Sequence, residues 1–259
     1  MVMRKSIKIA LCMALSASAV FASESGMLAS RAQKSLNVGK FAKGYSQLER
    51  ALVASRKEAD RRSEARIFIA MGQVRTKSLD YDMADSLLNY VENEGMDRST
   101  RGMLVKAKMA LKNATEKYSD AVTLCEGFDK DVLDKLEDLL QGAFYSECAI
   151  AYAGSHNSEK AAQALKMVGK STDDDTGIYF WTEARIADLQ NSGNADSLYR
   201  KAEAKSVEAN TPFTTANILY HRGKVLEKSN PAEAKKVFDR CKTAFELMGL
   251  PKNAKRCEK

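Results

Sequence analysis

The sequence predicts an all-α fold in which antiparallel helix pairs stack into an array. Helix formers are abundant, whereas the 259 residues include only 3 prolines and 14 scattered glycines, far fewer breakers than the turns of a β-rich fold need. Apolar and small residues recur three and four positions apart, which is the spacing of one helix face. A composition of 44% hydrophobic and 29% charged residues is that of a folded chain rather than a disordered one.

The first 22 residues are predicted to be a signal peptide, cleaved after Ala22. An apolar run of 13 residues extends from Ile9 to Phe21, followed by Ala22 and then by polar residues. This order of charged start, apolar stretch and small residue is typical of secretory signals. The positively charged start consists of Arg4, Lys5 and Lys8. We therefore expect an exported protein of the periplasm or cell envelope.

Two alternatives concern the same segment. A membrane anchor would need ~20 apolar residues, more than the run provides. A lipoprotein would use Cys12, but Leu11 precedes it where a small residue is required, and Cys12 comes early in the apolar run. No second apolar stretch follows, so the mature chain is expected to lack a transmembrane segment.

The charge of the mature chain gives little reason to expect nucleic-acid binding. The whole chain carries 41 Lys and Arg against 34 Asp and Glu, a net charge of +7. The signal peptide holds three of the basic residues and no acidic one, so 38 remain against 34, or +4. A weak charge spread along helices is not the concentrated basic patch that nucleic acids require.

The clearest helix pair is predicted between residues 65 and 91. Phe68, Met71 and Gly72 share one face of a first helix, and Ala84 and Leu88 share one face of a second. The segment 78–80, Ser-Leu-Asp, is expected to be the turn between them. Gly72 and Ala84 are small, as required where two helices approach closely.

The same pattern recurs along the chain. A helix over 27–36 is followed by one over 41–51, and further pairs are predicted over 104–125, 145–168, 181–202 and 219–241. In the last pair Pro231 follows Asn230, which predicts a capping Asn and a proline in the first helical position. Small residues mark the second helices at Gly44, Ala84, Ala121, Ala161, Ala195 and Ala234, at intervals of 40, 37, 40, 34 and 39.

The pattern Phe68-x-x-Met71-Gly72, followed by Tyr81-x-x-Ala84-x-x-x-Leu88-x-x-Val91, resembles the tetratricopeptide repeat. It departs from that family at Arg75, where an aromatic residue is usual, and at Val91, where Ala is usual; no proline closes the unit. The resemblance implies an α-solenoid, a right-handed superhelical array of about six pairs over residues 23–248. Residues 249–259 would form a polar cap or tail. The alternative is an irregular helical bundle.

Four cysteines remain in the mature chain, an even number in a compartment that permits disulfides. Cys125 and Cys148 occupy core positions of neighbouring helices, and Cys241 and Cys257 flank the C-terminal turn. Bridges between Cys125 and Cys148 and between Cys241 and Cys257 are therefore sterically plausible. The alternative is that all four are buried free thiols.

The sequence offers no catalytic or metal-binding constellation, and we expect neither an enzyme nor a cofactor. His156 lies in a polar segment that reads as a turn, and His221 lies on a predicted helix beside Arg222; both are interpreted as ordinary histidines. The run 173–175 of three aspartates lacks the ligand spacing of a calcium loop. It is interpreted as a solvated loop before a helix N-terminus.

By analogy with the family, the concave groove is expected to be lined by first-helix residues outside the core stripe. These are Arg66, Ile69, Gln73, Lys106, Ser146, Ile150, Tyr220 and Lys224. The Lys and Asn set with which some members clamp a C-terminal carboxylate is absent. The first hypothesis is thus a scaffold that binds an unspecified polypeptide. The alternative is a sensory module for a small molecule or cell-wall fragment near Trp181 and Tyr199.

Overall fold

The computed structural model describes residues 23–91, 96–173 and 176–258. Within these ranges every regular element is a helix and there is no strand, which confirms the predicted all-α class. No helix in the described part of the chain combines the length and apolarity needed to cross a membrane. The predicted signal peptide and cleavage after Ala22, together with Asp174 and Asp175, lie outside the described residues.

The helices follow one another with short connections. The N-terminal half contains α1 (Glu24–Asn37), α2 (Phe41–Lys57), α3 (Arg61–Lys77), α4 (Tyr81–Tyr90), α5 (Arg98–Ala114), α6 (Tyr118–Glu126) and α7 (Lys130–Leu133). The C-terminal half contains α8 (Asp138–Gly154), α9 (Ser158–Thr172), α10 (Gly177–Leu189), α11 (Ala195–Glu208), α12 (Pro212–Ser229), α13 (Pro231–Leu247) and α14 (Pro251–Arg256).

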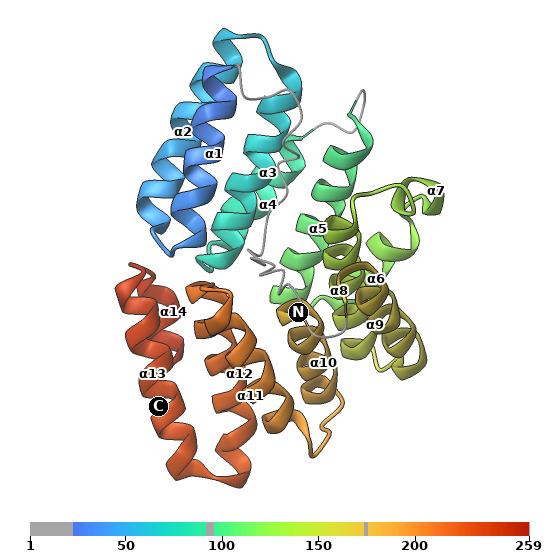
Figure 1. Cartoon of the computed structure of the whole chain (residues 1–259), viewed down its shortest axis with the longest axis vertical. Coiled ribbons are helices and arrows are strands. Elements are labelled where there is room, and N and C mark those ends of the chain that lie inside the picture. Colours follow the sequence, from blue (N-terminus) through green and yellow to red (C-terminus); the bar gives the residue numbers. More distant parts are fainter. Residues whose placement is uncertain (1–22, 92–95, 174–175, 259) are drawn as a thin grey trace, which may run out of the picture.

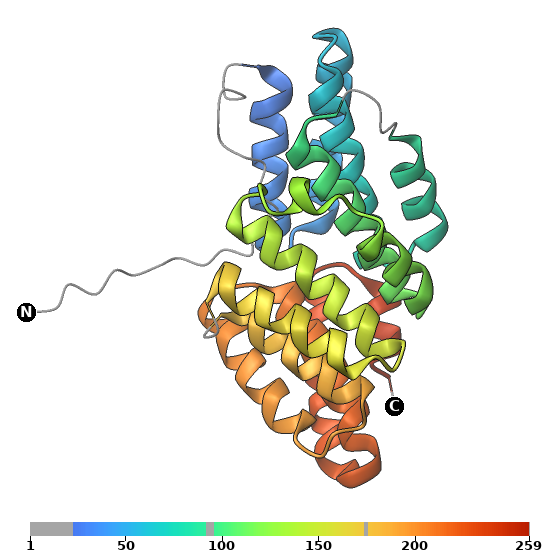
Figure 2. The same ribbon diagram turned by 90° about the vertical axis from the view of Figure 1, so that its right-hand side faces the viewer.

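Helices pack in pairs, and the pairs pack on one another. α1 packs on α2, α3 on α4, α5 on α6, α8 on α9, α10 on α11 and α12 on α13. Between pairs, α3 packs on α5, α5 on α8, and α8 on α10. Figure 1 shows the helices arranged around a common centre, and in Figure 2 the yellow and orange helices α8 to α11 lie in successive rows.

Several predicted boundaries are confirmed. The turn between α3 and α4 is residues 78–80, and His156 lies in the turn between α8 and α9. Asn230 caps α13: its side chain accepts a hydrogen bond from the backbone N–H of Glu233, and Pro231 is the first helical residue. The N-cap of α10 is Thr176, whose hydroxyl accepts from the N–H of Tyr179.

One turn geometry recurs at eight junctions among the described residues. In each, the second residue after the helix has positive φ and donates its N–H to the carbonyl three residues earlier, and the N–H of the next residue donates to the carbonyl five residues earlier. This closure satisfies carbonyls that a helix end leaves open. The positive-φ residues are Gly39, Ala59, Leu79, Glu116, His156, Asn191, Asn210 and Gly249. Most of these residues are not glycine, so the position of glycines in the sequence does not reveal the recurring turn.

The predicted small residues lie where helices of a pair meet. The five alanines, Ala84, Ala121, Ala161, Ala195 and Ala234, are buried, and so is Gly44. A Cβ atom added to Gly72 would lie 2.7 Å from Cγ of Leu88, and one added to Gly223 would lie 2.7 Å from a ring carbon of Phe238. At these two crossings, only glycine allows the observed approach.

The beginning and end of the array are in contact. The rings of Phe41 in α2 and Phe213 in α12 lie 5.4 Å apart, and the side-chain amide of Asn253 in α14 donates to the carbonyl of Lys77 in α3. One continuous core includes residues of α1, α2 and α3 together with residues of α12, α13 and α14. Figure 1 shows α14 beside the lower ends of α1 and α2. The array is therefore closed by its own termini.

The C-terminal segment is a helix rather than a free tail. α14 buries Asn253 and Ala254, and a disulfide joins Cys257, which follows it, to Cys241 in α13. A second disulfide joins Cys125 in α6 to Cys148 in α8. Their Cα atoms are 6.0 Å and 5.7 Å apart, respectively, within the range that disulfides span.

Candidate binding surface

Charged side chains from six helices form one electrostatically connected group, which we call the central cluster. It consists of Lys77 (α3), Lys106 (α5), Glu147 (α8), Arg185 (α10), His221 (α12) and Arg256 (α14). Glu147 interacts with Lys77, Lys106 and Arg185, while His221 interacts with Arg185 and Arg256. These helices surround the centre of the array (Figure 1), so the cluster joins elements that are distant in sequence.

Two lysines of the cluster, Lys77 and Lys106, have no ion-pair partner among the described residues. Both are half-buried, and within the described ranges neither ammonium group has a carboxylate within the 4.0 Å of an ion pair. Burial, and after it the charge of Lys106, lowers the pKa of Lys77 to about 8. Burial also lowers the pKa of Lys106. The ammonium of Lys77 lies 5.2 Å from the centre of the Phe213 ring.

The carboxylate of Glu147 is hydrogen-bonded to Asn113 and not to either lysine. The side-chain amide of Asn113 donates to the carboxylate of Glu147 at 2.9 Å and to its backbone carbonyl at 3.0 Å. Burial raises the pKa of Glu147, while the hydrogen bond from Asn113 and the charge of Lys106 act in the opposite direction. Glu147 therefore offsets part of the positive charge of the cluster from a distance.

Arg185 is the centre of a buried polar network. Its guanidinium donates to the carboxylate of Asp188, to the Tyr199 hydroxyl at 3.3 Å and to Nδ1 of His221 at 2.9 Å. The Tyr199 hydroxyl in turn donates to Asp188 at 2.8 Å. Burial and then the charge of Arg185 lower the pKa of His221 well below its usual range, which keeps the imidazole neutral and able to accept at Nδ1.

The aromatic residues of this region are only partly available to a ligand. Tyr199 is fully buried, so it cannot contact a ligand directly; its hydroxyl instead bonds to Arg185 and Asp188. Trp181 is half-buried, and its ring centre lies 5.6 Å from that of His221. Of the two aromatic residues that the sequence suggested for a ligand site, only Trp181 presents surface.

Arg256, the last residue of α14, contacts two residues of α12. Its guanidinium lies 4.1 Å from the centre of the Tyr220 ring and donates to the side-chain oxygen of Asn217 at 2.7 Å. Its Nε is buried and has no hydrogen-bond partner. Burial lowers the pKa of Arg256. Stacking on an aromatic face offsets part of the cost of holding this charge away from water.

The predicted groove lining is wrong at four positions. Ile69 and Ile150 are 2% and 5% exposed and belong to the interior. Arg66 is buried, donates to Thr100 at 2.9 Å and pairs with Asp97 at 3.3 Å. Ser146 is buried and shares a hydrogen bond with Thr182. α3 packs on α5, and α8 packs on both α5 and α10, so these helix contacts cover positions that the prediction left open.

The other four predicted residues retain accessible surface. Gln73, Lys106 and Tyr220 are half-buried and Lys224 is exposed. The prediction missed Lys77, Glu147, Arg185 and Arg256. No sequence signal distinguishes them, because single charged residues on helices are typical of solvated surfaces as well.

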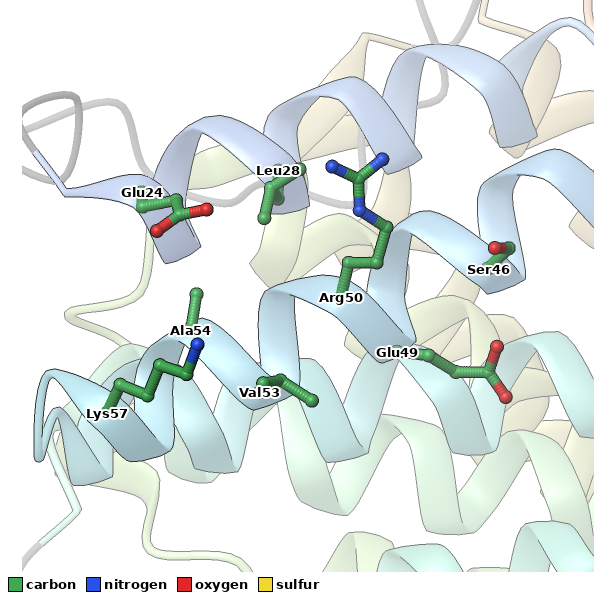
Figure 3. A pocket seen from close by; sticks show the side chains of 8 residues that line it. All are labelled: Glu24, Leu28, Ser46, Glu49, Arg50, Val53, Ala54 and Lys57. Atoms are coloured by element: carbon green, nitrogen blue, oxygen red, sulfur yellow. The ribbon is translucent and has the colours of Figure 1, made fainter.

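A second surface feature lies between α1 and α2. A shallow cavity of about 320 Å³ has Leu28, Val53 and Ala54 as its apolar lining. Its rim, shown in Figure 3, consists of Glu24, Ser46, Glu49, Arg50 and Lys57. Charges of both signs surround it, and none of them forms a nucleophile, a base or a paired acid site.

Neither feature resembles a metal or cofactor site. Across the described ranges, no group of three or more His, Cys, Asp or Glu residues is arranged to hold a metal ion. Neither the known protein families nor the curated proteins include a match to this chain. The central cluster is therefore the feature from which we infer a function.

Proposed function

We propose that this protein is an exported, non-catalytic scaffold that binds a polypeptide partner on the concave surface of a helical repeat array. In this proposal the fold is a right-handed superhelix of about six tetratricopeptide-like pairs over residues 23–248. Support for a repeat comes from the positive-φ turn, which recurs at eight junctions of the described chain. Stacked units of this kind bury a common core and present an extended preformed surface.

The observation that carries the binding proposal is the convergence of the central cluster. Six helices between α3 and α14 contribute ionisable side chains that interact with one another, and the two lysines among them, Lys77 and Lys106, have no ion-pair partner among the described residues. An exposed charge keeps its hydration and loses little free energy without an ion-pair partner, whereas a half-buried charge loses part of its hydration at a cost in free energy. A ligand that pairs with them recovers that cost, which is how a preformed site gains affinity.

Export is supported by the redox chemistry of the fold. Two disulfides link Cys125 with Cys148 and Cys241 with Cys257. Disulfides form and persist in oxidising compartments such as the periplasm. Together with the N-terminal sequence pattern, this favours a periplasmic or envelope-associated protein.

A second candidate function is the binding of a small molecule or cell-wall fragment. The observation in its favour is the ordered polar network of Arg185, His221 and Tyr199 beneath the half-buried Trp181. Fixed polar groups beside an aromatic surface are typical of small-ligand sites.

The two candidates are separated by crosslinking and affinity purification of the mature form from its native envelope. We expect a stoichiometric polypeptide with the unmodified protein and with Lys236→Glu, which alters a side chain on α13 that is 77% exposed. The same charge reversal at Lys106 or Lys224 should abolish recovery. Recovery of no polypeptide after crosslinking would contradict the scaffold and favour the small-ligand candidate.

A further inference from the structure

We propose that the ammonium groups of Lys77 and Lys106 together bind one oxyanion of the ligand, a carboxylate or a phosphate group. This inference rests on the proposed function, because it assigns a ligand chemistry to the same concave surface. It concerns a specific pair of residues on α3 and α5, two helices that pack directly against each other.

The placement of the two lysines is the first argument. Both are half-buried, and Lys77 and Lys106 are close enough for the charge of one to lower the pKa of the other. Two like charges that share a partly desolvated surface repel each other, and no carboxylate of the described chain is within ion-pair distance of either. An oxyanion placed between them would replace this repulsion with two charge-assisted contacts.

The surroundings of the pair are the second argument. The nearest acidic group of the cluster, Glu147 on α8, is hydrogen-bonded to Asn113 rather than to a lysine. On the α12 side, Lys77 faces the ring of Phe213, which carries no charge. Arg185 adds positive charge next to Glu147, although Arg185 itself pairs with Asp188. The surroundings of the two lysines therefore carry a net positive charge, because Glu147 is the one carboxylate of the central cluster and it lies beyond ion-pair distance of both.

The pair predicts a specific pH dependence of binding. The pKa of Lys77 is about 8 in the unliganded protein, and an anion beside the ammonium must raise it. Binding therefore takes up protons near and above that pH, and affinity should fall as the pH rises through about 8. The charged groups that face Lys77 from neighbouring helices are Lys106 and Glu147; burial lowers the pKa of Lys106 and raises that of Glu147.

Isothermal titration calorimetry of the full mature chain tests the proposal with two probes at constant ionic strength. Inorganic phosphate represents a free anion. Acetyl-triglutamyl-amide represents side-chain carboxylates of a polypeptide, with acetyl-triglutaminyl-amide as its neutral counterpart. We expect saturable binding of at least one anionic probe, none of the neutral peptide, and weakening above pH 8. Preference for the acidic peptide would identify a polypeptide carboxylate, and preference for phosphate a free anion.

Three variants locate the site. Lys77→Met and Lys106→Met should each weaken binding of the anionic probe by about tenfold or more. Lys108→Met is the matched control: it removes the same charge from α5, but its principal acidic neighbour is Asp85, outside the central cluster. Lys77→Arg, which keeps the charge, should retain binding and serves as a check on folding.

Two results would overturn the anion site: absence of saturable binding of both anionic probes, or an equal loss in Lys108→Met, which would indicate only net charge. The anion-site proposal and the scaffold proposal can fail separately. If Lys77→Met still captures the polypeptide partner at full yield, the scaffold stands and the anion site is wrong. If phosphate binds at the lysines but no partner is recovered, the scaffold is wrong and the anion site stands.

Discussion

The side-chain amide of Asn253 donates a hydrogen bond of 3.1 Å to the backbone carbonyl of Lys77, across 176 residues of sequence. This contact joins α14 to the end of α3 and places the last helix of the chain against one of the first. Lys77 also supplies an ammonium group to the central cluster. The contact that closes the array therefore involves a residue of the central cluster.

Replacement of Asn253 should loosen the closure without removing a helix. In Asn253→Ala the carbonyl of Lys77 loses a partly buried hydrogen bond from a side chain that is itself buried, and the loss of such a bond costs about 1–3 kcal/mol. We expect this loss in the free energy of unfolding by guanidinium denaturation. Lys252→Ala, an exposed neighbour in α14, is the control and should leave stability nearly unchanged. Equal stability of both variants would contradict a structural role for the contact.

Removal of the Cys241–Cys257 disulfide should release α14. The bridge closes a segment with a sequence separation of 16 residues, for which loop entropy predicts about 3 kcal/mol of stabilisation. In Cys241→Ser/Cys257→Ser, amide hydrogen exchange in α14 should accelerate. The matched control is Cys125→Ser/Cys148→Ser, which removes the other bridge, of separation 23, and should leave exchange in α14 slow. Unchanged protection of α14 in the first variant would show that the noncovalent contacts alone hold it.

The recurring turn predicts a stabilising substitution. Ala59 has φ of 53° and is exposed, so its methyl group strains the left-handed conformation without contributing to the core. Ala59→Gly should raise the free energy of unfolding by up to about 1 kcal/mol. Ala42→Gly, at an exposed position inside α2, should lower it by about 1 kcal/mol. Thermal unfolding of the two variants distinguishes a turn effect from a general effect of glycine.

Local features of this fold were predictable because they depend on residues close together in sequence. The crossing of Gly72 with Leu88 and the cap at Asn230 follow from spacing and residue type, and both are present. The closing contact between Asn253 and Lys77 carries no local pattern, since it depends on the summed curvature of all the intervening helices. The same holds for the central cluster.

The groove prediction shows where residue spacing becomes insufficient. Ile69 and Gln73 lie one helical turn apart, yet Ile69 is buried and Gln73 is half-buried. The difference arises because α3 contacts α5 as well as α4, and spacing within α3 does not reveal how far the neighbouring pair extends along it. Lys106 was among the predicted groove residues, whereas Lys77 was not, because Lys77 occupies the last turn of its helix.

The pKa of Lys77 predicts how stability changes with pH. Its value is lowered from 10.5 to about 8 in the folded protein, so between these values the unfolded chain binds more protons than the folded one. Folding stability from this group therefore rises as the pH increases from about 8 to 10.5. At lower pH the charged lysine is a destabilising group, by ~2 kcal/mol after a discount for its partial exposure to solvent.

Lys77→Met removes this dependence. Below pH 8 the variant should be more stable than the unmodified protein, and the difference should shrink towards pH 10.5, as measured by urea unfolding at each pH. Other groups that titrate in this range, including tyrosines, are common to both proteins and cancel in the comparison. Lys108→Met provides the second reference, because desolvation lowers its pKa too but Asp85 opposes the shift. A pH-independent difference between Lys77→Met and the unmodified protein would mean that Lys77 titrates normally, and that the repulsion invoked for the anion site is absent.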